Sequence, residues 1–303
     1  MIKLPHAQKK DQRESKSLAL VYLARGIDGG LRSAKEFFEA YRAFPAGCPH
    51  ELIVIAKGWA GIDGQAELLQ LIHSHSARLV DLPDDGFDWG GYMRLAPQLS
   101  HDWLCFLNTH SRPRVTGWLN LLKAAADAPS MNIGAVSASA SWQSLDIPIL
   151  PPPSLRKGYN TILIYPLRLF RNMLRLAINI RQIGDFAPFP NPHLRSNAFI
   201  IRRELFVDFA ATQRIPRCKR DAALLESGRL GFSVYLANRG LKALVTGADG
   251  KVYGPEQWIN SGTFRAPGQP NLLVADNQTT AYDMADQHLK RVLERLAWGQ
   301  AFS

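Results

Sequence analysis

The sequence is poor in cysteine, with Cys48, Cys105 and Cys218 as the three in 303 residues. They are odd in number, far apart and form no CxxC pair. Disulfide frameworks and structural zinc sites both depend on closely spaced cysteines. The pattern therefore argues against a disulfide-stabilised secreted domain and favours a reducing compartment.

Long hydrophobic runs are also missing. No stretch of about 18 residues is both apolar and free of charge, as a membrane-spanning helix requires. The first sixteen residues are polar and charged and lack the apolar stretch of a secretory signal. We interpret residues 1–16 as a flexible basic N-terminus ahead of a single domain, residues 17–303, and expect a cytoplasmic protein.

Several catalytic signatures do not occur. No GxGxxG follows the first expected strand, and the chain holds no GxxxxGKS/T, HExxH or GxSxG. These motifs cradle dinucleotides, cradle phosphates, bind zinc and expose a serine nucleophile. Dinucleotide-binding, P-loop, zinc-protease and serine-hydrolase functions therefore have no support.

Positive charge is present in excess, but in one region. Lysine and arginine total 36 against 26 acidic residues, and residues 151–220 hold thirteen basic and three acidic side chains. The rest of the chain is therefore balanced. A nucleic-acid-binding surface would interleave its basic residues with aromatic residues and glycines, whereas here they accompany aliphatic ones. We expect no nucleic-acid partner.

Apolar runs alternate with amphipathic stretches over the first half of the chain. The expected strands are 18–23, 51–56, 78–82, 103–107 and 133–137, with helices at 31–44, 65–75, 88–99 and 115–126. The last third adds strands 197–201 and 242–246 and helices 221–239 and 283–298. Such alternation predicts an α/β fold with a doubly wound, parallel sheet. Ligands of such sheets bind beyond the carboxyl ends of the strands.

Polar and cationic residues follow three of the expected strands. Arg25-Gly26, Lys57-Gly58 and the segment from Asn108 to Ser111 stand at the strand ends. Together they predict a site for an anionic ligand such as a nucleoside diphosphate. Ordinary solvated loop polarity would produce the same pattern.

The segment 145–195 interrupts the alternation between two groups of prolines. Within it, Leu167–Gln182 has arginine, asparagine and glutamine at offsets of three and four, and mostly apolar residues at the other positions. A helix with a basic face and an apolar face can lie in an anionic membrane surface. A core helix with an arginine-rich solvent face is the alternative.

Three groups of residues carry a family resemblance. They are Trp103 to Ser111 followed by Gly117-Trp118-Leu119, the segment Gly86-Phe-Asp-Trp-Gly-Gly-Tyr92, and Glu226-Ser-Gly228. In this order they resemble the GT-A glycosyltransferases, especially family 2 and its relatives of the rhamnan-synthesis type. The resemblance implies a GT-A-like, mostly parallel sheet flanked by helices. It divides the domain into a donor-binding half, 17–144, a basic amphipathic insertion, 145–195, and an acceptor half, 196–303.

The activity that this resemblance implies is transfer of a sugar, with inversion, from a nucleotide-sugar donor to a hydroxyl group. The acceptor would be a polysaccharide or a lipid-linked saccharide of bacterial polysaccharide biosynthesis. The protein would then be peripheral to the inner face of the cell membrane, held there through Leu167–Gln182.

The chain departs from the family where a metal would bind. Related enzymes end the fourth strand in a DxD-like pair, whose carboxylates can hold a divalent cation against the donor diphosphate. Asn108 and His110 occupy these positions. They are poor ligands for Mg²⁺, although histidine suits Mn²⁺ better, so metal dependence stays open. Arg25, Lys57 and Arg112 are candidates to supply positive charge to the donor instead.

Acidic residues of the resembling segments are the catalytic candidates. Family 2 enzymes place a general base near the start of a late helix, and we assign this role to Glu226, with Asp221 as the other acid nearby. Asp88, just before Gly90-Gly91, is a donor-binding candidate. Each of these carboxylates could instead be a helix cap or a complement to the helix dipole. The rival function is a GT-A-like protein without catalysis that binds or scaffolds in polysaccharide biosynthesis.

Overall fold

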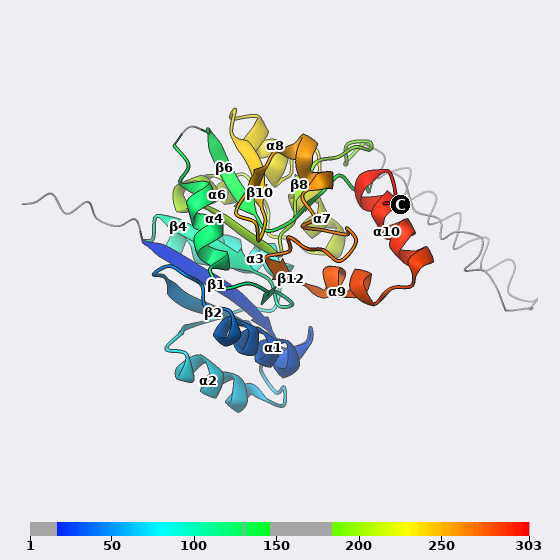
Figure 1. Cartoon of the computed structure of the whole chain (residues 1–303). Coiled ribbons are helices and arrows are strands. Elements are labelled where there is room, and N and C mark those ends of the chain that lie inside the picture. The colour runs from blue at the N-terminus through cyan, green and yellow to red at the C-terminus, as the bar shows by residue number, and fades with distance from the viewer. Residues whose placement is uncertain (1–16, 130, 146–183, 303) are drawn as a thin grey trace, which may run out of the picture.

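The inner strands of the central sheet are buried on both faces, which is why the sequence shows them as continuous apolar runs. The computed structural model describes residues 17–129, 131–145 and 184–302. Eight strands form one sheet in the order β11-β10-β6-β9-β4-β1-β2-β3 (Figure 1). Their bounds are β1 Leu18–Arg25, β2 Glu51–Lys57, β3 Arg78–Leu82, β4 Trp103–Leu107, β6 Ile133–Ser137, β9 Ala198–Arg202, β10 Lys242–Thr246 and β11 Val252–Tyr253.

The sheet is mixed, with most of its strands parallel. β1 pairs in parallel with β2 and β4, β2 with β3, and β6 with β10. β9 is antiparallel to both of its neighbours, β4 and β6, and β11 is antiparallel to β10. The expected α/β fold with a mostly parallel sheet flanked by helices is therefore confirmed. The antiparallel strand in the middle of the sheet was not predicted.

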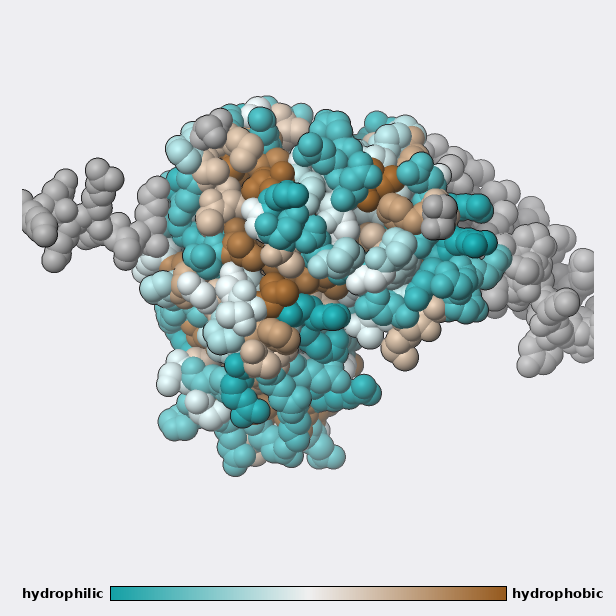
Figure 2. All heavy atoms as spheres, in the orientation of Figure 1, coloured by the Kyte–Doolittle hydropathy of each residue, from teal (hydrophilic) through white to brown (hydrophobic). Residues whose placement is uncertain are grey.

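Helices cover both faces of this sheet. Alternate residues of β1 point to opposite faces, so Leu20 and Tyr22 belong to one core and Val21 and Leu23 to the other. The first core receives side chains from α1 Gly30–Ala43, α2 Gln65–Ser74 and α4 Trp118–Ala126. The second receives them from α3 Phe87–Leu95, α6 Arg203–Ala211, α7 Lys219–Ser227 and α8 Phe232–Ala237. Figure 2 shows that the outer surface over α1 and α2 is mostly hydrophilic, as expected of helices that turn their apolar side to a sheet.

Smaller elements complete the described chain. β5 Arg112–Pro113 pairs with β12 Val274–Ala275, and β7 Ala140–Ser141 pairs with β8 His193–Leu194. The short 3-10 helices are η1 Ala96–Gln98 and η4 Pro255–Asn260, and the chain continues through α9 Asn277–Met284 and α10 Gln287–Trp298. None of the helices within the described ranges has the length and apolar character needed to cross a bilayer.

Two expected long helices differ from the structure. The helix expected over 221–239 is divided into α7 and α8 by the segment Gly228 to Gly231. A side chain at either glycine would approach the carbonyl oxygen of Leu224 to 2.7 Å or less, so the two helices meet in a turn that only glycine permits. The helix expected over 283–298 is α10 Gln287–Trp298, which begins four residues later, because residues 283–284 are the end of α9. Asp286 caps α10 by accepting a hydrogen bond from the Leu289 N–H at 2.7 Å.

Two predictions lie outside the described residues. They are the flexible N-terminus over 1–16 and the amphipathic helix Leu167–Gln182. The membrane contact expected of that helix therefore stays a prediction.

Candidate active site

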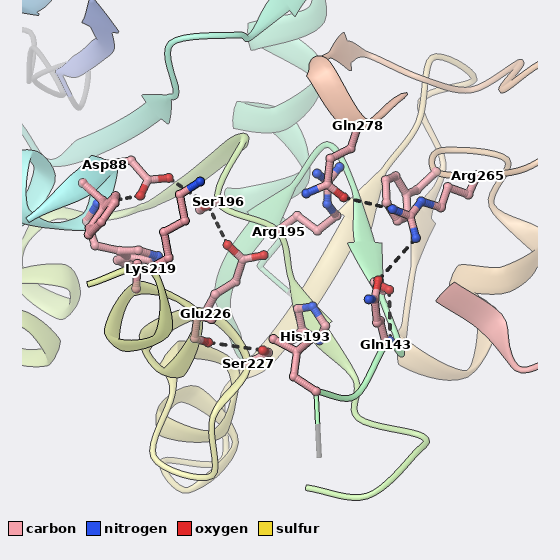
Figure 3. Close-up of a pocket in the computed structure, with 17 residues that line it drawn as sticks. Asp88, Gln143, His193, Arg195, Ser196, Lys219, Glu226, Ser227, Arg265 and Gln278 are labelled. Atoms are coloured by element: carbon pink, nitrogen blue, oxygen red, sulfur yellow. Dashed lines mark hydrogen bonds between the residues drawn. The ribbon is translucent and has the colours of Figure 1, made fainter. Parts of the chain in front are cut away.

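A pocket of about 360 Å³ opens at the carboxyl end of the sheet. We call it the main pocket. Its walls come from the start of α3, the chain after β7, the segment around β8, helix α7, and the chain from Phe264 to α9 (Figure 3). The polar residues used below are Asp88, His193, Arg195, Ser196, Glu226 and Arg265.

Asp88 reaches this pocket because of a strained turn before α3. Gly86 and Phe87 both have left-handed backbone, with φ of 69° and 54°. Lys57 is fully buried beneath this turn, and its Nζ donates hydrogen bonds of 2.5 Å to the carbonyl oxygens of Asp85 and Phe87. The turn is thereby held against β2, and it places Asp88 in the first turn of α3. Lys57 is thus a positioning residue, where the sequence suggested a donor-binding one.

Asp88 and Glu226 share one hydroxyl group. Ser196 Oγ lies 3.1 Å from Asp88 Oδ2 and 2.7 Å from Glu226 Oε2. A serine hydroxyl has a single proton and can donate it to one of these carboxylates at a time. Two acidic groups from α3 and α7, far apart in the sequence, are therefore brought within reach of one side chain, as Figure 3 shows.

The environment of this pair favours its protonated forms. Burial raises the pKa of Asp88, and the charge of Glu226 raises it further. Burial also raises the pKa of Glu226, against the lowering effect of its hydrogen bond with Ser196. A carboxyl whose pKa moves towards neutrality is suited to accept and release a proton during a reaction.

A buried ion pair supports the pocket from behind. Arg195 Nη2 donates to Asp276 Oδ2 at 2.6 Å, and both side chains are at least 94% buried. Asp276 also caps α9 through the Thr279 N–H at 2.8 Å. Burial alone would raise the pKa of Asp276, but the charge of Arg195 and these hydrogen bonds hold it below its usual value. His193 lies nearby, and burial lowers its pKa to about 4, so the imidazole is neutral at neutral pH.

A second, smaller pocket of about 250 Å³ lies where β1 and β4 end. We call it the strand-end pocket, and its polar residues include Arg25, Asp28, Asp88, Asn108, His110 and Lys219. Phe87, Asp88 and Lys219 line both pockets, so the two adjoin each other. Of the strand-end residues singled out in the sequence, Arg25, Asn108 and His110 line this pocket, whereas Lys57 lines neither pocket.

The side chains at the end of β4 do not fit a divalent-cation site. Asn108 Oδ1 accepts hydrogen bonds from the His110 N–H and from Ser111 Oγ. The His110 ring lies 3.3 Å from both Ser33 Oγ and Asp28 Oδ1. Within the described ranges, no three His, Cys, Asp or Glu side chains gather as a metal-binding group. The local donor set therefore lacks the several oxygen ligands that Mg²⁺ takes.

The other candidate residues lie in different places. Arg25 lines the strand-end pocket, where its Nε contacts Asp84 Oδ1 at 2.7 Å. Arg112 is paired with Glu36 and lines neither pocket. Asp221 lies in the first turn of α7, whereas Glu226 is next to the last residue of that helix. Asp221 accepts a hydrogen bond from the Arg217 N–H at 2.9 Å and also lines neither pocket.

Sequence reasoning missed much of the main pocket. His193 and Arg195 end the segment interpreted as an insertion, and Ser196 begins the expected acceptor half; the available signal was the polar run before strand β9. Arg265, Gln143 and Gln278 also line the pocket. They come from loops and a helix start that carry no recognisable motif.

Comparison with known proteins gives distant structural likenesses only. No protein-family model matches the chain, and no curated protein sequence matches it. One similar structure is CMP:2-keto-3-deoxy-manno-octonic acid synthetase with CTP, at 11% identity and a TM-score of 0.39, over 76% of this chain and 88% of that one. Another is 4-diphosphocytidyl-2C-methyl-D-erythritol synthase from Anaerococcus prevotii, at 11% identity and a TM-score of 0.43 over the same shares.

A third similar structure is glucosyl-3-phosphoglycerate synthase from Mycobacterium tuberculosis with Mn²⁺, uridine diphosphate and glucosyl-3-phosphoglycerate. It is 15% identical, with a TM-score of 0.34, over 62% of this chain and 57% of that one. Likenesses at this distance do not identify what the present chain binds or transfers.

Proposed function

We propose that this protein is a glycosyltransferase that moves a sugar from a nucleotide-sugar donor to a hydroxyl group of a saccharide acceptor. The observation that carries the proposal is the Asp88–Ser196–Glu226 arrangement, which borders a pocket with cationic residues at the strand ends. A proton acceptor thereby adjoins a pocket that contains the cations Arg25 and Lys219. The motif resemblance to GT-A enzymes of family 2 and the rhamnan-synthesis type supports the same reading.

In this mechanism Glu226 acts as the general base. Its carboxylate takes the proton of the acceptor hydroxyl, and the acceptor oxygen forms a bond to the anomeric carbon of the donor sugar. The bond from that carbon to the diphosphate oxygen breaks, and the nucleoside diphosphate leaves with the electron pair. Attack from the face opposite the leaving group inverts the configuration.

Positive side chains beside the donor would stabilise the departing diphosphate. Arg25 and Lys219 line the strand-end pocket, and none of the ion pairs within the described residues includes Lys219. A guanidinium or ammonium group placed where negative charge develops lowers the barrier electrostatically. Ser196 keeps the Glu226 carboxylate oriented, and Asp88 faces both pockets.

We propose further that the acceptor is a polysaccharide or lipid-linked saccharide and that Leu167–Gln182 contacts anionic lipid at the inner face of the cell membrane. Support comes from its alternating basic and aliphatic residues. Each arginine near a charged surface contributes about 1 kcal/mol. Replacing Arg168, Arg171 and Arg175 by glutamate should release the protein from anionic vesicles at low salt, whereas neutral vesicles should bind neither form. Equal sedimentation of both forms with anionic vesicles would remove this part of the proposal.

A binding or scaffolding protein without catalysis is the second candidate. It is favoured by Asn108 and His110, because Asn108 Oδ1 and both ring nitrogens of His110 already have partners inside the protein. Such a protein would bind a nucleotide sugar or saccharide without turning it over.

Nucleotide binding and turnover separate these functions. The melting temperature should rise with at least one of UDP, GDP, CDP, ADP or dTDP, each tested with and without Mn²⁺, because a ligand of the native state stabilises it. The matching nucleotide sugar should then be consumed when a saccharide acceptor is added. Binding without consumption by either wild type or Glu226→Gln would favour the scaffold, and no binding of any nucleotide would refute donor use.

A further inference from the structure

Arg265 is a buried cation in the main pocket that the protein leaves without a counter-ion. Its side chain is 7% exposed, and none of the ion pairs among the described residues includes it. The Nη atoms contact Gln143 Oε1 at 3.3 Å, the Leu293 carbonyl oxygen at 3.4 Å and Gln278 Oε1 at 3.2 Å. Its Nε is buried and has no hydrogen-bond partner.

Arg195, in the same pocket, has the counter-ion that Arg265 lacks. It donates to the Asp276 carboxylate at 2.6 Å, a distance typical of a charge-assisted hydrogen bond. Both guanidinium groups lie over the ring of Phe264, at 4.1 Å for Arg195 and 4.9 Å for Arg265. The nearby acid is thus committed to Arg195, and Arg265 has only neutral oxygens at longer distances.

Burial and nearby positive charge oppose the charged form of Arg265. Burial and the neighbouring charge of Arg195 lower its pKa to about 10, so the group is strained electrostatically yet still charged at neutral pH. Removing a charged group from water without pairing it is expensive. An anion entering the pocket beside Arg265 would supply the missing counter-charge.

The pocket has an acidic side and a basic side. Figure 3 shows the two carboxylates Asp88 and Glu226 with Ser196 and one cation, Lys219, on one side, and Arg265 with Gln143 and Gln278 and no acid on the other. A ligand with an anionic group would be repelled at the carboxylates and attracted at Arg265. Its other end would then face Glu226.

We propose that Arg265 binds an anionic group, carboxylate or phosphate, of the sugar acceptor and thereby turns the reacting hydroxyl towards Glu226. The assignment of this ligand as the acceptor rests on the proposed function. The preference of the pocket for an anion does not, because it follows from Arg265 and its surroundings alone.

Binding of matched saccharides without any nucleotide tests this preference. Glucose 6-phosphate and glucuronate are each compared with glucose at constant ionic strength, by calorimetric titration and by melting temperature. Wild type should bind one of the charged sugars at least about tenfold more tightly than glucose, as expected of hydrogen bonds to a charged group. The phosphate and carboxylate arms identify which anion is preferred. Inorganic phosphate and malonate probe the same site without a sugar ring.

Gln278→Glu is the most direct test, because it places a carboxylate of the protein itself beside Arg265. Gln278 is exposed, so the substitution should not disturb the fold. It should abolish the preference for charged sugars without removing any arginine. Gln278→Met, which adds no charge, should keep the preference. Arg265→Gln should lose it, Arg265→Lys should keep part of it, and Arg291→Gln, which removes an exposed charge on α10, should not change it.

The inference is overturned if wild type binds charged and neutral probes equally, if it binds none of them, or if Gln278→Glu retains the preference. Nucleotide binding and turnover are measured separately. A charged-sugar preference in a protein that binds no nucleotide would uphold the anion site and refute the glycosyltransferase. Turnover of a nucleotide sugar by a protein that does not prefer charged sugars would support the glycosyltransferase and refute the anion site.

Discussion

The two adjoining pockets differ in how their charges are balanced. In the strand-end pocket, Arg25 is paired with Asp84, His110 lies against Asp28, and Asn108 is occupied by its own loop. In the main pocket, two carboxylates share the hydroxyl of Ser196, and Arg265 has no acid.

This difference indicates where a ligand contributes most. A group that is already paired gains little from a new partner, whereas a buried group without one gains the full interaction. We therefore expect substitutions in the main pocket to change function strongly. The same kind of substitution in the strand-end pocket should have smaller effects.

The largest expected effect is that of Glu226→Gln on turnover. Removing a general base costs about 10²–10⁴-fold in rate, while the affinity for a nucleoside diphosphate in the adjoining pocket should stay near wild type. Steady-state kinetics and calorimetric titration measure the two quantities. Asp221→Asn is the matched variant on the same helix, outside both pockets, and should keep its turnover. If Asp221→Asn lost activity and Glu226→Gln did not, Asp221 would be the base.

The next largest effect concerns the ion pair behind the pocket. Asp276→Asn leaves the buried Arg195 without its counter-ion and weakens the cap of α9. Breaking a buried pair in this way costs about 3–5 kcal/mol of stability, which urea denaturation can measure. Arg265→Gln is the matched change, and because it leaves no unpaired acid it should alter stability much less. Similar losses of unfolding free energy in the two variants would contradict the view that Arg195 has a counter-ion and Arg265 has none.

A smaller effect should appear in the pH dependence of stability. The pKa values of Asp88 and Glu226 are raised by burial, so the folded protein retains protons that the unfolded chain has already released. Their unfavourable contribution is absent below the ordinary carboxyl range and grows as pH rises through the raised values. Asp88→Asn should therefore raise the melting temperature at neutral pH, and this gain should vanish in acid.

Asp221 supplies a control of opposite sign for that experiment. Hydrogen bonds from the Arg217 N–H and from Cys218 lower its pKa, so its stabilising contribution is present at neutral pH and disappears as pH falls through the lowered value. Asp221→Asn should slightly lower the melting temperature at neutral pH. A melting temperature of Asp88→Asn below that of wild type at neutral pH would show that Asp88 is stabilising when charged.

The smallest expected effect lies in the strand-end pocket. The double change Asn108→Ala and His110→Ala should weaken nucleoside diphosphate binding by a few-fold, since both side chains mainly contact their own surroundings and each neutral hydrogen bond contributes about 1 kcal/mol. Calorimetric titration with the nucleotide found in the thermal panel measures this loss. A loss of a hundredfold or more would mean that these two residues bind the diphosphate directly.

Much of the fold was predictable because short apolar runs in the sequence indicate buried strands. The strands at 103–107, 133–137 and 242–246 were predicted with the bounds that the structure gives them. Each is a short apolar run between turn residues, and its burial on both faces leaves no alternation to confuse the pattern. The direction of β9 could not be predicted, because strand pairing is decided by contacts between segments that are distant in the chain.

The site divides in the same way. The sequence by itself determined that Asp88 and Glu226 stand beside glycine-containing turns and that polar residues follow the first, second and fourth strands. Only the tertiary structure decided that Ser196 lies between the two carboxylates, that Lys57 holds the turn before α3, and that Asp276 neutralises Arg195 and leaves Arg265 unpaired. Charge balance depends on distances between side chains, and segments far apart in the sequence acquire those distances when the chain folds.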